Sequence, residues 1–198
     1  MTKERLEAFT DGVVAIVITI LVLEIKFPTS PSIDALYEMR HIFLAYLVSF
    51  VFISVIWVSH HRLFQAADKI TYRVIWANLF WLFWLTLCPT VTSWVGKFPG
   101  QLYPELLYAF VYTMWSYSFG LVSREVATAN GPDSIVAKMI KRDRRSMISM
   151  FINCGLIAGV FLFPPIALIG RFLVSGIWIV SYENAEKLFT FKKKFPYS

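Results

Sequence analysis

The chain has 198 residues, of which 57% are hydrophobic, 17% aromatic and only 16% charged, and its formal net charge is +6. This is the composition of a membrane protein, and it excludes a water-soluble domain, which would hide its apolar residues in periodic stripes rather than in long runs. The positive charge is expected to lie in loops that face anionic lipid headgroups, so nucleic acid is not an expected partner.

Six apolar runs divide the chain, and each is close to the length of about 20 residues that crosses the hydrocarbon of a bilayer. A cleaved signal peptide is the alternative for the first run, but no small-residue cleavage site follows it. The sequence therefore predicts an all-α integral membrane protein with six transmembrane helices in a single domain, residues 1–198. The runs are about Ala8 to Leu23, Ile42 to Ser59, Val74 to Val95, Leu102 to Val122, Met147 to Phe163 and Ile166 to Ser181.

Basic residues alternate between the loops. Lys and Arg concentrate in the N-terminus, the second loop, the fourth loop and the C-terminus, whereas the other loops hold only Lys26, Arg40 and Lys97. Because cytoplasmic loops carry the excess of basic residues, both termini are expected to be cytoplasmic. Arg171, one turn into the sixth run, has two interpretations, a partner of a carboxylate or a side chain that extends its guanidinium toward the membrane surface, and the second is favoured.

The first run combines a short apolar stretch with an aspartate. Its uninterrupted part, Val13 to Leu23, has 11 residues, which is too short to span lipid alone. We therefore expect this helix to lie in the protein interior or beside water. Asp11 has two interpretations that the sequence leaves open: a helix N-cap assisted by Thr10, or a buried ionic partner.

One stripe of this helix follows helical spacing of three and four residues. A stripe of apolar side chains is also present on any ordinary membrane helix, so periodicity alone does not identify a pore. Asp11 points away from the stripe. Its members are Arg5, Phe9, Gly12, Ile16, Thr19 or Ile20, and Leu23.

The second run ends in "WVSHHRLF", with Trp57, His60 and His61 on the expected cytoplasmic side. Neighbouring histidines diverge by about 100° on a helix and rarely bind one ion, so neither a metal nor any other cofactor is expected. A hydrogen-bonded anchor among Arg5, Asp11, Trp57 and one of the two histidines is the favoured interpretation.

The stretch "RLEAFTDG", Arg5 to Gly12, resembles the R-x-x-x-F-S-D-G signature of the transmembrane protein 175 family, with Thr10 in place of the serine. The following "VVAIVITILVLEI" and the "WVSHHRLF" of the second run are also similar to its bacterial members. The resemblance implies a homotetrameric potassium channel of the bacterial cytoplasmic membrane, in which the first helix lines the pore. It implies leak-like conduction with modest selectivity over sodium and no carbonyl filter.

The resemblance also assigns pore positions by their distance from the aspartate. The hydrophobic constriction falls on Ile16, a hydroxyl layer on Thr19, and further pore-lining positions on Ile20 and Leu23. These residues belong to the stripe that the spacing indicates.

Two other functions compete with the channel. A proton-coupled secondary transporter of a cation or small solute would use Asp11 as its protonatable group, but no inverted repeat or carboxylate at mid-membrane depth supports it. An enzyme is not expected, because the histidines lack a nucleophile or a metal set nearby in sequence.

Overall fold

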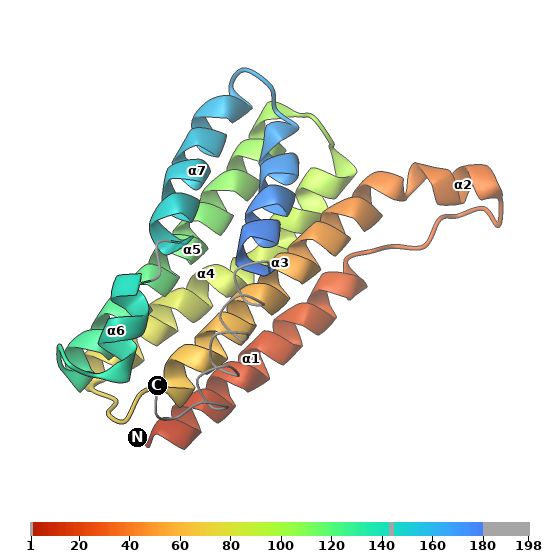
Figure 1. Ribbon diagram of the computed structural model, residues 1–198. Coiled ribbons are helices and arrows are strands. Elements are labelled where there is room, and N and C mark those ends of the chain that lie inside the picture. The colour runs from red at the N-terminus through yellow and green to blue at the C-terminus, as the bar shows by residue number, and fades with distance from the viewer. Residues whose placement is uncertain (1, 143–144, 180–198) are drawn as a thin grey trace, which may run out of the picture.

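The computed structural model describes residues 2–142 and 145–179, and in these ranges the chain is a bundle of helices without strands (Figure 1). The all-α prediction is therefore confirmed. The helices are α1 Lys3–Leu23, α2 Ile33–Glu38, α3 Arg40–Gln65, α4 Tyr72–Lys97, α5 Leu102–Asn130, α6 Ile135–Arg142, α7 Arg145–Val160 and a last helix, Ile166–Ile179.

Three helices are long and apolar enough to cross a membrane by length and composition, namely α1, α3 and α4. Residues 146–160 and 166–179 form shorter apolar helices. The fourth long helix, α5, is rich in tyrosine and serine, which lower its hydropathy although it has 29 residues. Each predicted run thus coincides with a helix over most of its described residues. The fifth run was predicted to end at Phe163, but α7 ends at Val160, and Val180 and Ser181 of the sixth run lie outside the described residues.

The connection that the sequence predicts between the fourth and fifth runs contains helical residues. The α5 helix continues past Val122 to Asn130 and ends where Gly131 takes a φ of 88°, a backbone conformation that favours glycine. The short helix α6 follows it. The Asn130 side chain accepts hydrogen bonds from the backbone N–H groups of Asp68 and Lys69, at 2.8 and 2.9 Å, which ties α5 to the α3–α4 connection.

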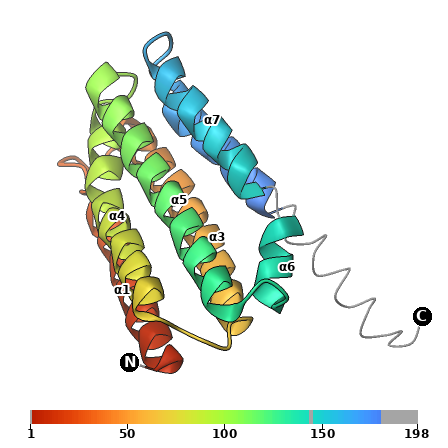
Figure 2. The same cartoon turned by 90° about the vertical axis from the view of Figure 1, so that its left-hand side faces the viewer.

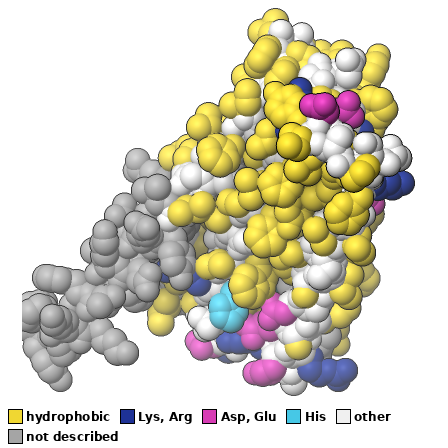
Figure 3. Space-filling view, turned by 90° about the vertical axis from the view of Figure 1, so that its right-hand side faces the viewer, with side chains coloured by type: hydrophobic (Ala, Val, Ile, Leu, Met, Phe, Trp, Pro, Cys, Tyr) yellow, Lys and Arg dark blue, Asp and Glu magenta, His cyan; other side chains and the backbone are white. Residues whose placement is uncertain are grey.

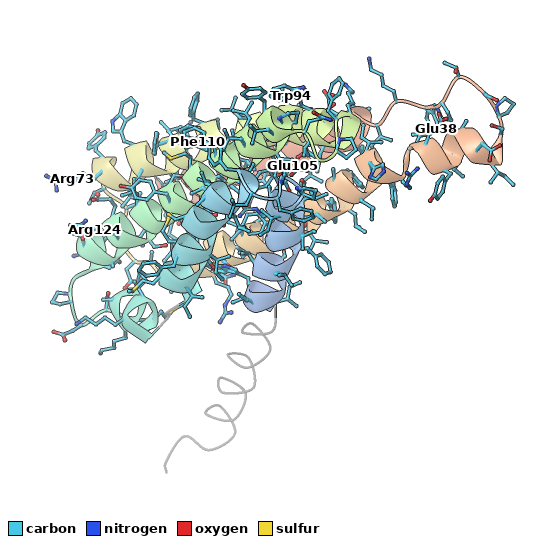
Figure 4. The ribbon with its side chains drawn as sticks, turned by 90° about the horizontal axis from the view of Figure 1, so that it is seen from above. Glu38, Arg73, Trp94, Glu105, Phe110 and Arg124 are labelled. Atoms are coloured by element: carbon cyan, nitrogen blue, oxygen red, sulfur yellow. The ribbon has the colours of Figure 1, made fainter. Side chains whose placement is uncertain are left out.

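The connections gather alternately at the two ends of the bundle. The start of α1 and the α3–α4 and α5–α6 connections lie at the lower end in Figures 1 and 2. The α4–α5 connection and the turn between α7 and the last helix lie at the upper end. Seen from above, Arg73 and Arg124 stand at the opposite end from Trp94 and Glu105 (Figure 4).

The last two helices form the tight hairpin that the sequence predicts at Pro164 and Pro165. Backbone hydrogen bonds close the turn, among them Phe163 N–H to the Gly159 carbonyl at 2.9 Å. The two helices approach closely, because a Cβ at Gly170 would lie 2.1 Å from Leu156 Cδ2. Small residues at such contacts let helix backbones approach, as is typical of membrane bundles.

The interior of the bundle combines aromatic rings with hydroxyl groups. The Ser49 and Thr92 hydroxyls lie 2.9 Å apart, and they reach the Tyr108 and Tyr112 hydroxyls at 3.2 and 3.1 Å respectively. These bonds join α3, α4 and α5. Since lipid is as apolar as a leucine side chain, packing and such hydrogen bonds hold membrane helices together.

The α1 helix runs along the edge of the bundle, against α4 and α3 (Figure 1). An arm that contains α2 follows it and extends away from the other helices, with Glu38 at the end of α2 that leads into α3 (Figures 1 and 4). On the side of the molecule where α1 runs, hydrophobic side chains cover the middle and charged ones gather toward the two ends (Figure 3). This distribution suits a bilayer environment.

Candidate functional site

The α1 helix has two contrasting faces. Its buried side chains recur every three or four residues and pack against α3 and α4. The opposite face is exposed in the single chain, although most of its side chains are large and apolar. The buried residues are Leu6, Thr10, Val14, Val17 and Leu21.

The exposed face coincides with the stripe that the sequence indicates. Its apolar members remain accessible over large fractions: Phe9 is 51% exposed, Ile16 60%, Ile20 41% and Leu23 76%. Arg5, Gly12 and Thr19 lie exposed with them. We call this set the α1 stripe.

Thr19 is the hydroxyl of the α1 stripe, and its proton is already engaged. Thr19 Oγ1 donates a hydrogen bond of 2.8 Å to the carbonyl oxygen of Ile16, one turn earlier on the helix. The lone pairs of the hydroxyl oxygen therefore remain free to face outward as acceptors. An acceptor of this kind suits a cation or water and not an anion.

Asp11 lies inside α1 and is half-buried, so the N-cap interpretation is wrong. The helix begins at Lys3, and the Thr2 side chain caps it by accepting from Arg5 N–H. The carboxylate of Asp11 instead accepts a hydrogen bond of 2.8 Å from Trp57 Nε1 on α3. This charge-assisted bond joins the first helix to the second long helix of the chain.

A buried hydrogen-bonded chain lies next to this pair. Asn78 on α4 donates through Nδ2 to Thr10 Oγ1 at 2.8 Å, and its Oδ1 lies 2.8 Å from His60 Nε2 on α3. All three side chains are almost completely buried. The chain thus connects α1, α4 and α3 through one amide.

The His60 ring is held by aromatic contacts on both sides. Its centroid lies 4.7 Å from the Trp81 ring and 4.3 Å from the Phe64 ring, and both pairs are nearly parallel. Sequence reasoning missed Asn78. Its signal was available, since a lone amide within an apolar run is costly unless it has partners.

His61 occupies a different environment from His60. It is exposed, its ring stacks on Trp57 with centroids 5.9 Å apart, and Gln65 lies 2.8 Å from its Nε2. Neither histidine bonds directly to Asp11. Across the described residues, no group of three His, Cys, Asp or Glu side chains could hold a metal ion.

Arg5 lies apart from Asp11 in the single chain. The two residues are six positions apart on α1, which places them on different faces. Arg5 is exposed, and within the described residues its guanidinium makes no ion pair with the carboxylate. A contact between these two side chains would have to form between two copies of the chain.

Comparison with known proteins gives consistent matches. Residues 5–89 match the family model described as "Endosomal/lysosomal potassium channel TMEM175". A protein named potassium channel from Chryseobacterium sp. (strain P1-3) is 37% identical over 94% of this chain and 97% of its own length. Another protein named potassium channel, from Chamaesiphon minutus, is 33% identical over 72% of each chain.

Animal and structural relatives extend the comparison. The chicken protein named endosomal/lysosomal proton channel TMEM175 is 33% identical over 54% of this chain but only 24% of its own length. The crystal structure of a lysosomal potassium-selective channel TMEM175 homolog from Chamaesiphon minutus superimposes with a TM-score of 0.80 and 26% identity, over 90% of this chain and 97% of that one.

Proposed function

Because this chain belongs to the TMEM175 family of membrane ion channels, we propose that it conducts potassium through a pore lined by α1 at the centre of a homotetramer. The observation that carries the proposal is the α1 stripe, a large apolar surface with one hydroxyl that the single chain leaves uncovered. Four copies around an axis would turn this surface toward a shared pathway.

Assembly around α1 also agrees with the position of the helix at the edge of the bundle. Its buried face is already occupied by α3 and α4, so its other face is free to meet further copies. Gly12 lies exposed on that face, and a Cβ placed there would meet no atom of the chain within 4 Å. The glycine would therefore leave space at the inner mouth of the pore.

The constriction is proposed at Ile16. A ring of four branched apolar side chains stops ions by dewetting, without any charged plug. Ile16 is 60% exposed and lies near the middle of α1, away from the charged groups at the helix ends. A small widening of the ring would rehydrate it and permit leak-like conduction.

Selectivity is proposed to involve Thr19. An apolar ring supplies no oxygen to replace the hydration shell of a cation, so the ion must keep water or find oxygen nearby. The Thr19 hydroxyl lies one turn from Ile16, and its outward lone pairs fit this need. Ile20 and Leu23 extend the pathway beyond it. Because one oxygen per chain is a sparse coordination shell, discrimination against sodium should be modest.

The anchor keeps the pore helix in place. The Asp11–Trp57 bond and the buried chain of Thr10, Asn78 and His60 hold α1 against its own bundle. Arg5 of a neighbouring copy would complete the anchor. It would find an acceptor in Glu7, whose Oε1 is buried and has no hydrogen-bond partner in the single chain. Thr10 and Asp11 of the signature thus act on the side of α1 that faces its own bundle, whereas Arg5, Phe9 and Gly12 belong to the α1 stripe.

The orientation follows from the basic residues. Arg73 and Arg124 lie at the end of the bundle where α1 begins, which by the excess of basic residues would be the cytoplasmic end (Figure 4). Six helices would then span the cytoplasmic membrane of a bacterium, with both termini inside.

Flux into liposomes tests the function. Liposomes holding the purified protein and potassium are diluted into potassium-free medium, and a pH-sensitive dye follows the proton entry that balances potassium efflux. We expect the dye to be quenched only after a proton ionophore is added. We expect slower quenching when the liposomes hold sodium in place of potassium. The reason is that potassium leaves through the pore without needing a counter-substrate.

The same experiment separates the alternatives. Quenching before the ionophore would show that protons pass through the protein itself, as the names of the animal relatives state for those proteins. An absence of potassium efflux from inserted, tetrameric protein would contradict the proposal and favour the secondary transporter.

A further inference from the structure

Arg171 lies inside the bundle, which corrects the prediction that it reaches the membrane surface. Its side chain is 1% exposed. The guanidinium carbon lies 4.6 Å from the Phe52 ring centroid and 5.0 Å from that of Tyr112, and Nη1 donates a hydrogen bond of 3.1 Å to Asn153 Oδ1. The residue therefore joins the last helix to α3, α5 and α7.

The charge of Arg171 has no counter-charge. In residues 2–142 and 145–179 no aspartate or glutamate pairs with it, and its guanidinium donates to a neutral amide, that of Asn153. Guanidinium stays protonated in proteins. The two cation–π contacts offset only part of the free-energy cost of burying an uncompensated charge.

The surroundings of Arg171 contain further donors without acceptors. Arg171 Nε, Asn153 Nδ2 and Trp115 Nε1 are all buried and make no hydrogen bond in the described chain. The Trp115 ring lies 5.5 Å from that of Phe52 and 6.1 Å from that of Tyr112, the two rings that flank the guanidinium. We call Arg171 and Asn153, whose side chains are joined by a hydrogen bond, the donor cluster.

The hydroxyl groups of the bundle interior do not satisfy the donor cluster. The hydroxyls of Ser49, Thr92, Tyr108 and Tyr112 bond to one another, and none of them accepts a hydrogen bond from Arg171 Nε or Asn153 Nδ2. Such a group of buried donors is unfavourable unless an acceptor joins it. A water molecule would satisfy hydrogen bonds but would leave the positive charge uncompensated.

We infer that the donor cluster binds a small monovalent anion of the halide type. Such an anion accepts several N–H bonds at once and neutralises the guanidinium in the same step. The donors come from α7 and the last helix, whereas α1 packs against α4 and α3. The site is therefore separate from the proposed pore, and the anion would stabilise the fold without permeating.

Thermal unfolding of the purified wild-type protein tests the site. The unfolding midpoint is followed while chloride or bromide replaces gluconate at constant potassium and constant ionic strength. A ligand that binds only the folded protein raises the midpoint in a saturable way. We expect such a rise for both halides, and we expect Arg171→Gln to abolish it.

Matched controls give the test its specificity. Arg124→Gln removes the same charge from an exposed position at the other end of α5, and it should keep the halide response of the wild type. If Arg171→Gln does not fold, anomalous diffraction from crystals grown in bromide decides, with a peak expected beside the guanidinium. Bromide peaks found only at the protein surface would indicate an adventitious ion only and would overturn the inference. An unfolding midpoint that does not depend on halide would overturn it as well. Neither result would bear on potassium conduction.

Discussion

Replacing Ile16 with asparagine is expected to raise potassium flux through the reconstituted protein and to weaken its preference for potassium over sodium. An amide ring at the constriction would hold water where isoleucine excludes it. Every 1.4 kcal/mol removed from such a barrier is a factor of about ten in rate, so we expect an increase of about tenfold or more. The liposome dye assay measures both the rate and the ion preference.

Ile169→Asn is the matched control for this variant. Ile169 is 53% exposed in the single chain, close to the 60% of Ile16, but it lies on the last helix and outside the α1 stripe. Its substitution should leave flux and selectivity within the error of the wild type. Equal effects of the two substitutions, with both proteins tetrameric, would contradict a constriction at Ile16.

Replacing Asp11 with alanine is expected to damage assembly or folding. The change removes the acceptor of Trp57 Nε1 and leaves that half-buried donor unpaired, which is unfavourable by about 1–3 kcal/mol. For a chain of this size each kcal/mol lowers the unfolding midpoint by about 2–4 °C. Size-exclusion chromatography should show loss of the tetramer, and scanning fluorimetry should show a lower midpoint.

Two further variants test whether the Asp11–Trp57 hydrogen bond is the cause of the damage expected in Asp11→Ala. Trp57→Phe keeps an aromatic ring but removes the donor, so it should shift the midpoint in the same direction by a smaller amount. Asp34→Ala removes a carboxylate from the exposed arm, and it should change neither property. An intact Asp11→Ala tetramer with altered ion selectivity would contradict the anchor role and place Asp11 in the pathway.

The helices were the most predictable part of the structure. Long apolar runs must form helices in lipid, because backbone groups there find hydrogen-bond partners only within the helix. The end of α5 was missed because the segment after Val122 is polar, yet Gly131 provides the stop signal only nine residues later. Hydropathy reports the membrane-embedded part of a helix and not its extension beyond the bilayer.

The α1 stripe was also predictable, because helical spacing alone places Phe9, Ile16 and Leu23 on one face. Partners across helices were less accessible. Trp57 was among the expected partners of Asp11, but a single sequence does not say how α3 and α4 rotate about their axes. That rotation decides that His60, and not His61, joins the buried chain with Asn78.

Arg171 shows the same limit. Long basic side chains near helix ends usually reach the interface, and that tendency led to the wrong expectation. The aromatic rings and the asparagine that enclose its guanidinium come from three other helices, far apart in sequence. Only the packed bundle brings them together.

Cysteine accessibility at Thr19 tests the central claim most directly, namely that α1 lines the conduction pathway. Thr19→Cys is made in a Cys154→Ser background, since Cys154 is exposed and the other cysteine, Cys88, is buried. A charged, water-soluble thiol reagent should then reduce potassium flux in liposomes strongly, while the background protein keeps its flux. Complete labelling of the introduced cysteine, shown by mass spectrometry, with unchanged potassium flux would contradict the account.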